Sequence, residues 1–294
     1  MKILRHIILI ILISVSVYVH ANTTRDIGNE PELNIKLISK WIIFYTNVER
    51  LKNGKDPIQY DIDIEKAAQW QAEYCAKTRD LAHVIKVNGM NAPKDRIEHF
   101  GSRCGNCGEN LTVKFITNTE GILYYIKKGD KGTYFDFGNY TIYYRNEQQM
   151  GYSMVDSWMK SPNHRKNILH TGFLWIGRGA AKGIYNNNKS YYGCQVFNGY
   201  GGLPREFIKA KYELSGMKIR KSSKDGKDLF YISYKGELKP GIIEVNEDNE
   251  LISHPLENNK DELVFVNKTR TKGLLFAALY DKTTDILYPV ILLK

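Results

Sequence analysis

Three stretches of the chain repeat apolar residues at the three- and four-residue spacing of an amphipathic helix. The first runs from Leu33 to Leu51, the second from Asp63 to His83, and the third from Glu147 to Lys160, where Pro162 prevents its continuation. The spacing predicts a helix over each stretch. It also predicts that His83 stands at the far end of the second helix.

Two strand-like runs follow the predicted helices and are separated by an asparagine-rich turn. They cover Phe173 to Ala181 and Tyr191 to Phe197, and together they predict a β-hairpin. Gly177 and Gly179 alternate along the first strand. Because alternate residues of a strand share a face, we expect another part of the chain to approach this face closely.

Residues 117–145 form a tyrosine-rich insertion in which aromatic and polar residues alternate around a Lys-Gly-Asp-Lys-Gly turn. This pattern predicts a two-stranded flap. An isolated hairpin is marginally stable, so the flap is expected to pack on the rest of the domain. Its tyrosines could alternatively form a platform that contacts a sugar or a lipid.

The character of the chain changes after residue 203. Helical periodicity is replaced by short strand-like runs between turns rich in Gly, Asn, Asp and Lys. The runs are Leu229–Tyr234, Gly241–Val245, Leu263–Val266, Leu274–Tyr280 and Ile286–Leu293. We therefore expect an α+β domain over residues 33–203 and a small all-β, sandwich-like module over residues 204–294. The one histidine of this module, His254, is interpreted as a loop residue.

The first 21 residues have the three-part pattern of a secretory signal peptide. Lys2 and Arg5 precede an apolar run, and a small-residue cleavage pattern ends at Ala21. The run is short of the roughly 20 residues of a spanning helix. The sequence thus predicts a signal peptide at 1–21, a linker at 22–32, and an exported protein of the periplasm, cell surface or medium without an integral membrane segment.

The chain has a formal net charge of +10, which is a modest basic bias. Such a bias favours anionic lipid or envelope surfaces. The sequence lacks a Lys/Arg run typical of nucleic-acid binding, and nucleic acid is not an expected partner. The sequence leaves the oligomeric state open.

Four cysteines are present, at positions 75, 104, 107 and 194. In an exported protein an even number of cysteines predicts disulfides, and three pairings of four cysteines exist. Cys104 and Cys107 have the spacing of half a zinc site, but a second Cys or His pair at ligand spacing is missing from the sequence. Disulfides are therefore the favoured interpretation, with Cys75, Cys104, Cys107 and Cys194 as candidates.

Few titratable residues of the first domain stand outside predicted core and turn positions. The candidates are His83, His164 just after Pro162, and Glu109, which lies between Gly108 and Asn110 in a predicted turn. Two imidazoles and a carboxylate suit a metal with an open coordination position, or a general acid/base pair. Their separation along the chain does not indicate whether they meet.

Six ordered segments resemble one known family. They read NVERLKNG, AQWQAEYCAKTRDLAH, GENLTV, VDSWMKSPNHRKNIL, FLWIGRGAA and YYGCQVF, and they cover roughly residues 35–200. They are similar to the CAP superfamily of cysteine-rich secretory proteins, antigen 5 and pathogenesis-related 1 proteins, in its bacterial SCP-like branch. The resemblance implies a three-layer α-β-α sandwich around a central antiparallel sheet, followed here by the β-rich module.

The resemblance also implies a cleft with two histidines and two acids that binds a divalent metal in several members. His83, Glu109 and His164 match three of these positions. Ser161 stands three residues after Trp158, where the family usually has its second acid. The expected cleft residues are therefore His83, Glu109, His164 and Ser161, and the expected metal ligands are His83, Glu109 and His164, with zinc as the expected ion. Arg96 resembles a position that braces helices.

Two classes of function follow from this resemblance. The leading hypothesis is a secreted binding module for a lipid, an envelope component or a surface protein, with the β-rich module as a second contact surface. The alternative is a peptidase or esterase that uses a metal, or Ser161, His164 and Glu109, to activate a nucleophile. A structural alternative makes Glu109 an anchor that is salt-bridged to His164. A further alternative assigns the function to the C-terminal module.

Overall fold

The computed structural model describes residues 24–26, 30–119, 124–126, 133–136, 143–199, 214–259, 262–267 and 272–294. The predicted signal peptide at 1–21 and the predicted domain boundary at 203/204 lie outside these residues. In the described part of the chain, every helix falls short of the length and apolar character that crossing a bilayer requires.

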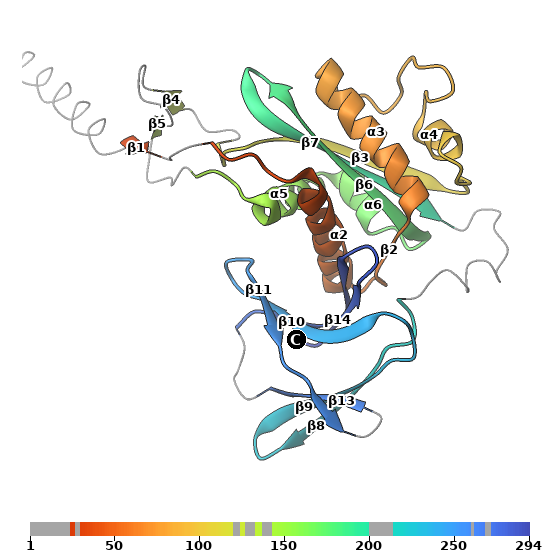
Figure 1. Ribbon diagram of the computed structural model, residues 1–294, viewed down its shortest axis with the longest axis vertical. Helices are drawn as coiled ribbons and strands as arrows, with labels where there is room; N and C mark the ends of the chain where they lie inside the picture. The colour runs from red at the N-terminus through yellow and green to blue at the C-terminus, as the bar shows by residue number, and fades with distance from the viewer. Residues whose placement is uncertain are drawn as a thin grey trace, which may run out of the picture.

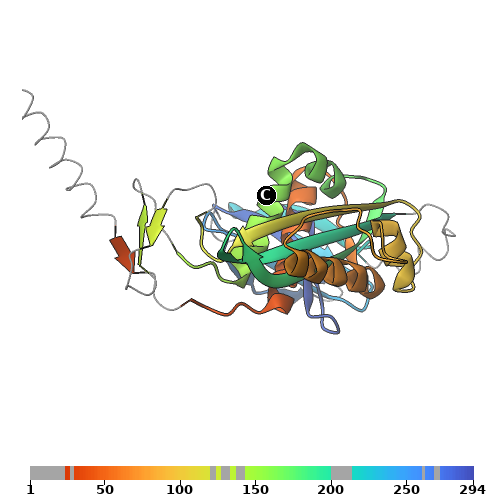
Figure 2. The ribbon, with the colours of Figure 1, turned by 90° about the horizontal axis from the view of Figure 1, so that it is seen from above.

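The first domain is the expected α+β sandwich of three layers (Figure 2). Its sheet has the strand order β2-β6-β7-β3. These strands are β2 (Gln59–Tyr60), β3 (Cys107–Phe115), β6 (Phe173–Tyr185) and β7 (Asn188–Gly199). The sheet is antiparallel except for the short parallel pair of β2 and β6. The predicted hairpin is confirmed as β6 and β7.

Helices cover both faces of this sheet (Figures 1 and 2). One face carries α3 (Ile62–Thr78) and α4 (Pro93–His99), and the other carries α2 (Ile35–Lys52), α5 (Glu147–Lys160) and α6 (Pro162–Ile168). Separate hydrophobic clusters fill the two interfaces, one around Ala68 and Cys194 and one around Ile42 and Trp158. The sheet thus forms a partition between two cores.

The three predicted helices are present, and their ends have local causes. Asn34 caps α2 by accepting from the backbone N–H groups of Lys36 and Leu37. The α5 helix has the predicted bounds. The second prediction was wrong at its end: α3 stops at Thr78, where Arg79 takes a left-handed φ of 59°. His83 consequently lies in the loop between α3 and α4.

The tyrosine-rich insertion contains a pair of strands, as the flap prediction requires. Strands β4 (Tyr124–Ile126) and β5 (Thr133–Asp136) pair antiparallel, and β1 (Thr24–Asp26) pairs with the other edge of β5. The two expectations for the flap, packing on the domain or a tyrosine platform for a sugar or lipid, concern side chains that lie outside the described residues.

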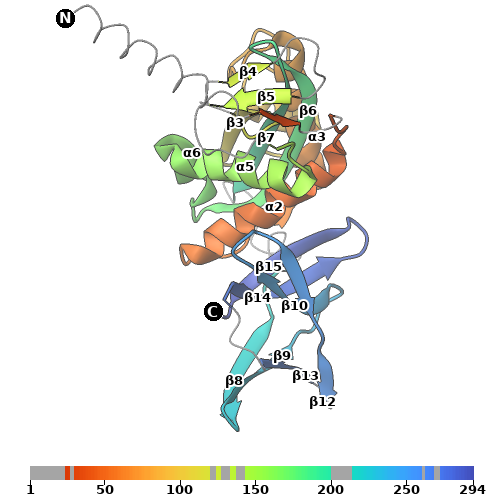
Figure 3. The same cartoon turned by 90° about the vertical axis from the view of Figure 1, so that its left-hand side faces the viewer.

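The C-terminal module is all β and consists of two four-stranded sheets. One sheet has the order β11-β10-β14-β15 and the other β12-β13-β9-β8, and the second lies beyond the first as seen from α2 (Figures 1 and 3). The strands are β8 (Lys218–Lys224), β9 (Lys227–Ser233), β10 (Lys239–Val245), β11 (Leu251–His254), β12 (Glu257–Asn259), β13 (Glu262–Asn267), β14 (Leu274–Asp281) and β15 (Ile286–Leu292).

Residue His254 ends β11 instead of lying in a loop, and its Nε2 is 3.2 Å from the Glu244 carboxylate. The loop interpretation was therefore wrong.

The module packs directly against α2 of the first domain (Figure 3). One hydrophobic cluster runs without interruption from Ile42 and Phe44 of α2 to Phe276 of β14 and Ile286 of β15. At its rim, Lys40 forms an ion pair with Asp285. The two parts of the chain therefore share a core.

Candidate functional site

Glu109 lies in strand β3 and not in a turn. Gly108 pairs with Phe197 and Glu109 with Val196 in the ladder between β3 and β7. The glycine serves close packing instead: a Cβ at position 108 would lie 3.1 Å from the Asn167 side chain and from the Phe173 ring. The predicted turn was wrong because a glycine needed for close approach has the same appearance in a sequence as a glycine needed for a bend.

The carboxylate of Glu109 is almost completely buried and has two partners. Its Oε1 lies 2.8 Å from Nδ1 of His83, and Nη2 of Arg96 donates to its Oε2 at 2.6 Å. The exposed fraction is 1% for the Glu109 side chain and 0% for that of Arg96. A buried carboxylate is costly unless it is paired, and here a buried guanidinium compensates its charge.

Arg96 also organises the loop that carries His83. Its guanidinium donates to the main-chain carbonyls of His83 at 3.1 Å, Met90 at 3.1 Å and Asn91 at 3.4 Å. One cation therefore fixes both the acid and the backbone of the first histidine. The sequence predicts only a bracing role for Arg96, because no regular spacing relates it to Glu109.

Asparagines hold α6 against β3 and thereby position His164. The Asn110 side chain donates to the main-chain carbonyl of His164 at 3.1 Å. In the other direction, the Asn167 side chain donates to the carbonyl of Glu109 at 3.2 Å and to Oδ1 of Asn110 at 2.9 Å. Asn110 therefore connects β3 with α6.

The two histidines face each other across the site. Their ring centroids are 6.4 Å apart and the rings are inclined by 56°. His83 is the more accessible of the two, with 45% of its side chain exposed, and His164 is partly buried. Burial lowers the pKa of His164, and the neighbouring His83 lowers it further. Desolvation thus favours the neutral imidazole of His164. The structure therefore brings His83, Glu109 and His164 together, with the imidazoles as the accessible groups.

Ser161 lies between α5 and α6. Its backbone N–H donates to the carbonyl of Trp158 at 3.2 Å, and its side chain forms no capping hydrogen bond with α6. Among the described interactions, none joins its hydroxyl to His164 or to Glu109. The described contacts hence do not assemble the nucleophile and base of the hydrolase hypothesis. The expected ion pair between Glu109 and His164 is likewise replaced by the pairs with His83 and Arg96.

The predicted metal ligands fit a divalent ion only in part. Within the described ranges, no group of three or more His, Cys, Asp or Glu side chains is arranged to hold a metal. Both oxygens of Glu109 are engaged, one of them by a cation, so this carboxylate does not fit the predicted ligand set. The remaining donors are the two imidazoles. Zinc binding stays a prediction that depends on His83 and His164.

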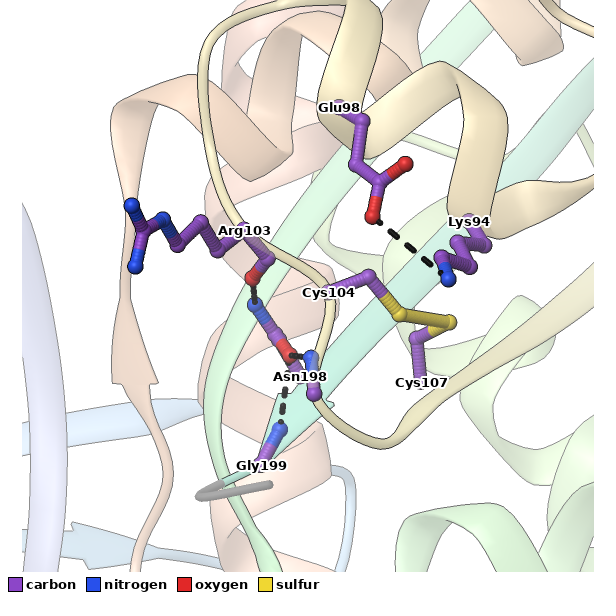
Figure 4. The surroundings of a disulfide bond; sticks show 8 residues. Lys94, Glu98, Arg103, Cys104, Cys107, Asn198 and Gly199 are labelled. Atoms are coloured by element: carbon purple, nitrogen blue, oxygen red, sulfur yellow. Dashed lines mark hydrogen bonds and ion pairs between the residues drawn. A yellow bond between two sulfur atoms is a disulfide. The ribbon is translucent and has the colours of Figure 1, made fainter. Parts of the chain in front are cut away.

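A disulfide joins Cys104 and Cys107 immediately before Glu109 (Figure 4). The loop is fastened to β7 by Asn198, whose amide donates to the carbonyl of Arg103 at 2.7 Å and accepts from the N–H of Gly105 at 3.3 Å. The prediction of a disulfide is confirmed for this pair. Cys75 and Cys194 are free and buried, so their candidacy for a disulfide was wrong.

We expect neither free thiol to react with Ellman's reagent in the native protein at pH 8. Burial raises the pKa of Cys75 to about 12 and that of Cys194 well above its ordinary range, which disfavours the reactive thiolate. Two thiols per chain should react after unfolding in guanidinium chloride. Four thiols should react if a reductant is first added and removed. Fewer than two in the unfolded, unreduced protein would mean that Cys75 and Cys194 are bridged.

The chain shares part of its length with two curated relatives from Bacillus subtilis (strain 168). It is 27% identical over 146 residues to the uncharacterized protein YkwD, covering 50% of this chain and 43% of the relative. It is 23% identical over 149 residues to the uncharacterized membrane protein YlbC, covering 51% of this chain and 33% of the relative. The match thus covers less than half of either relative.

Two solved structures are similar at a low level. An extracellular protein containing a SCP domain from Bacillus anthracis str. Ames has a TM-score of 0.38 and 16% identity, covering 56% of this chain and 41% of that one. An outer surface protein from Borrelia burgdorferi has a TM-score of 0.38 and 15% identity, covering 58% of this chain and all of that one. The family comparison is stronger. The model of the cysteine-rich secretory protein family, CAP, matches residues 43–197, more than half of the chain, and the protein therefore belongs to the CAP family.

Proposed function

We propose that this CAP protein is an exported binding protein for anionic lipid or envelope surfaces, and that His83 and His164 belong to its contact surface. The observation that carries the choice of binding over hydrolysis is the state of Glu109. Its carboxylate is 1% exposed and is held by both Arg96 and His83. A general base must reach the proton that it removes, and this acid is closed off by its partners.

The accessible chemistry of the site supports a binding role. Nδ1 of His83 is engaged with Glu109, which leaves Nε2 as the ring nitrogen available to a ligand. The imidazole of His164 lies opposite that of His83. The negative charge of the buried Glu109 is already compensated by Arg96. Burial favours the neutral form of His164, which has one N–H donor and one acceptor nitrogen, so a phosphate or a hydroxyl group at the surface of a ligand would be a suitable partner for this ring.

The positive net charge of the protein supports an anionic surface as its binding partner. Removal of the predicted signal peptide with Lys2 and Arg5 lowers the formal charge from +10 to +8. This remaining positive charge favours association with anionic headgroups or polymers over long distances, with a strength that falls as salt screens the charges. The signal-peptide pattern at residues 1–21 supports export, where such surfaces are met. Among described residues there is no spanning helix, and association from outside the bilayer is the proposed mode.

Vesicle co-sedimentation tests the proposal. The mature protein should bind vesicles with half phosphatidylglycerol and half phosphatidylcholine, and this binding should weaken as NaCl is raised. The double variant His83→Ala/His164→Ala should bind several-fold more weakly. The matched control is His99→Ala, because His99 is an exposed histidine at the end of α4, outside the site. Equal binding to pure phosphatidylcholine vesicles, or an equal loss in both variants, would contradict the proposal.

Activity assays on the wild-type protein and on a Ser161→Ala/His164→Ala variant test the hydrolase alternative. We expect no turnover of casein peptides or of p-nitrophenyl esters above the rate of the Ser161→Ala/His164→Ala variant. A wild-type rate that this double variant abolishes, while its melting temperature stays unchanged, would overturn the assignment as a binding protein.

A further inference from the structure

A cavity lies where the CAP domain meets the C-terminal module, away from the two histidines. It has a volume of about 390 Å³ and is lined by α2, by the start of α5 and the residues before it, and by the turn between β10 and β11. Figure 3 shows that these elements, although distant in the sequence, lie side by side. Ligand pockets are commonly found at such junctions between domains, and this volume is within their range.

The wall from the C-terminal module is fixed by hydrogen bonds. The main-chain carbonyl of Asn249 accepts from the Tyr45 hydroxyl at 3.1 Å and also from the Gln148 amide. Within the turn, the Asn246 side chain accepts from the N–H groups of Asp248 at 3.0 Å and Glu250 at 2.8 Å. The turn is therefore tied both to itself and to α2 and α5, and the cavity is preformed.

Two tyrosines, Tyr143 and Tyr152, provide accessible aromatic surface in this cavity, whereas Tyr45 is only 2% exposed and packs against Tyr152. Tyr45 and Tyr152 pack edge to face with ring centroids 5.1 Å apart, and Tyr143 stands at the rim with 41% of its surface exposed. Burial raises the pKa of Tyr45 to about 12, so its ring carries a neutral phenol at physiological pH. The negative faces of tyrosine rings attract cations, and this attraction is strongest where water is partly excluded.

The charges that line the cavity are predominantly negative. Asp248 and Glu250 form no ion pair with any described residue, whereas Asp156 is paired with Lys160 at 2.7 Å. The cation in the lining, Arg145, is buried, and its guanidinium donates to the carbonyls of Phe115 and Thr117. Its Nη1 is therefore directed into the protein, and Asp248 and Glu250 remain exposed at the rim without an ion pair to a described residue.

We infer that this cavity binds a small organic cation, in which an ammonium group with apolar substituents lies against the tyrosine rings and faces Asp248 and Glu250. Tyrosine faces and unpaired carboxylates both favour a positive charge, and the ring surface favours the apolar substituents around it. A neutral sugar could use the rings and the amides, but it would leave the two carboxylates without a counter-charge. This site is independent of the surface proposed around His83 and His164.

Titration calorimetry on the full mature chain tests the inference with choline and its neutral isostere 3,3-dimethylbutan-1-ol. Choline should bind, and the isostere, which has the same shape without the charge, should bind at least about tenfold more weakly. The variant Asp248→Asn/Glu250→Gln should lose about tenfold in choline affinity, which corresponds to about 1.4 kcal/mol. Glutamine at 250 can still accept the hydrogen bond from Asn246.

Glu247→Gln is the matched control, because Glu247 is an exposed acid in the same turn that does not line the cavity. It should leave choline affinity unchanged. A second variant, Tyr152→Leu, should weaken choline binding through the loss of a ring. If that variant fails to fold, the exposed carboxylate variants still decide. Equal binding of choline and its isostere, an equal effect of Glu247→Gln, or binding of N-acetylglucosamine without choline would each overturn the inference.

Discussion

Replacing Arg96 by methionine is expected to lower the free energy of unfolding by about 3–5 kcal/mol. Arg96 is fully buried, and its guanidinium compensates the buried carboxylate of Glu109 at 2.6 Å. Methionine fills much of the same volume but leaves this carboxylate without its cation and three main-chain carbonyls without their donor. Denaturant unfolding followed by circular dichroism gives the loss directly.

Two further variants separate the charge from the general effect of substitution. Lys94→Met, on the same helix, removes an exposed cation whose pair with Glu98 spans 3.7 Å, and it should cost at most about 0.5 kcal/mol. Adding Glu109→Gln to Arg96→Met should recover at least about 1 kcal/mol, because the unpaired charge is then gone. A loss below about 1 kcal/mol for Arg96→Met would show that the buried ion pair is unimportant for stability.

Replacing Gly179 by alanine is expected to destabilise the protein by about 3 kcal/mol, although the change adds one methyl group. A Cβ at this position would lie 2.4 Å from the carbonyl oxygen of Ala68 and 2.5 Å from its carbonyl carbon. These are backbone atoms of α3 and cannot rotate away, so the helix itself must shift. The loss can be measured by the same denaturant unfolding.

The control is Gly241→Ala in strand β10. A Cβ there meets no atom within 4 Å, and the backbone does not require a left-handed conformation. Its free energy of unfolding should change by less than about 1 kcal/mol. If both substitutions had similar effects, the close contact between α3 and the sheet would not be the reason for glycine at 179.

The close contact at Gly179 was predictable because glycines at alternate positions leave one face of a strand without side chains, and a neighbouring backbone can then approach it. The helices were predictable because their apolar faces repeat over several turns. The end of α3 was not, because the residue in the left-handed conformation is Arg79 and not a glycine, so nothing in the sequence marks the stop.

The sequence predicted which residues form the candidate site, but it did not predict their hydrogen-bond and ion-pair partners. His83, Glu109 and His164 were found because family motifs contain them, and the structure brings them together. The partner of Glu109 was missed because Arg96 reaches it through a loop, and a pairing made by tertiary packing leaves no periodic pattern. The cavity between the CAP domain and the C-terminal module was missed for the same reason. Its walls come from segments that lie far apart in the chain, as the contacts of Asn249 with Tyr45 and Gln148 show.

The hydrophobic cluster shared by α2, β14 and β15 has a consequence for how the chain folds. A fragment that ends near residue 203 would present the apolar side of α2 to water, and the complementary fragment would present the sheet that contains β14 and β15. Each half would then tend to self-associate through its exposed apolar surface. We therefore regard the two halves as one cooperative folding unit, in which the C-terminal strands cover the apolar side of α2 and so protect it from aggregation.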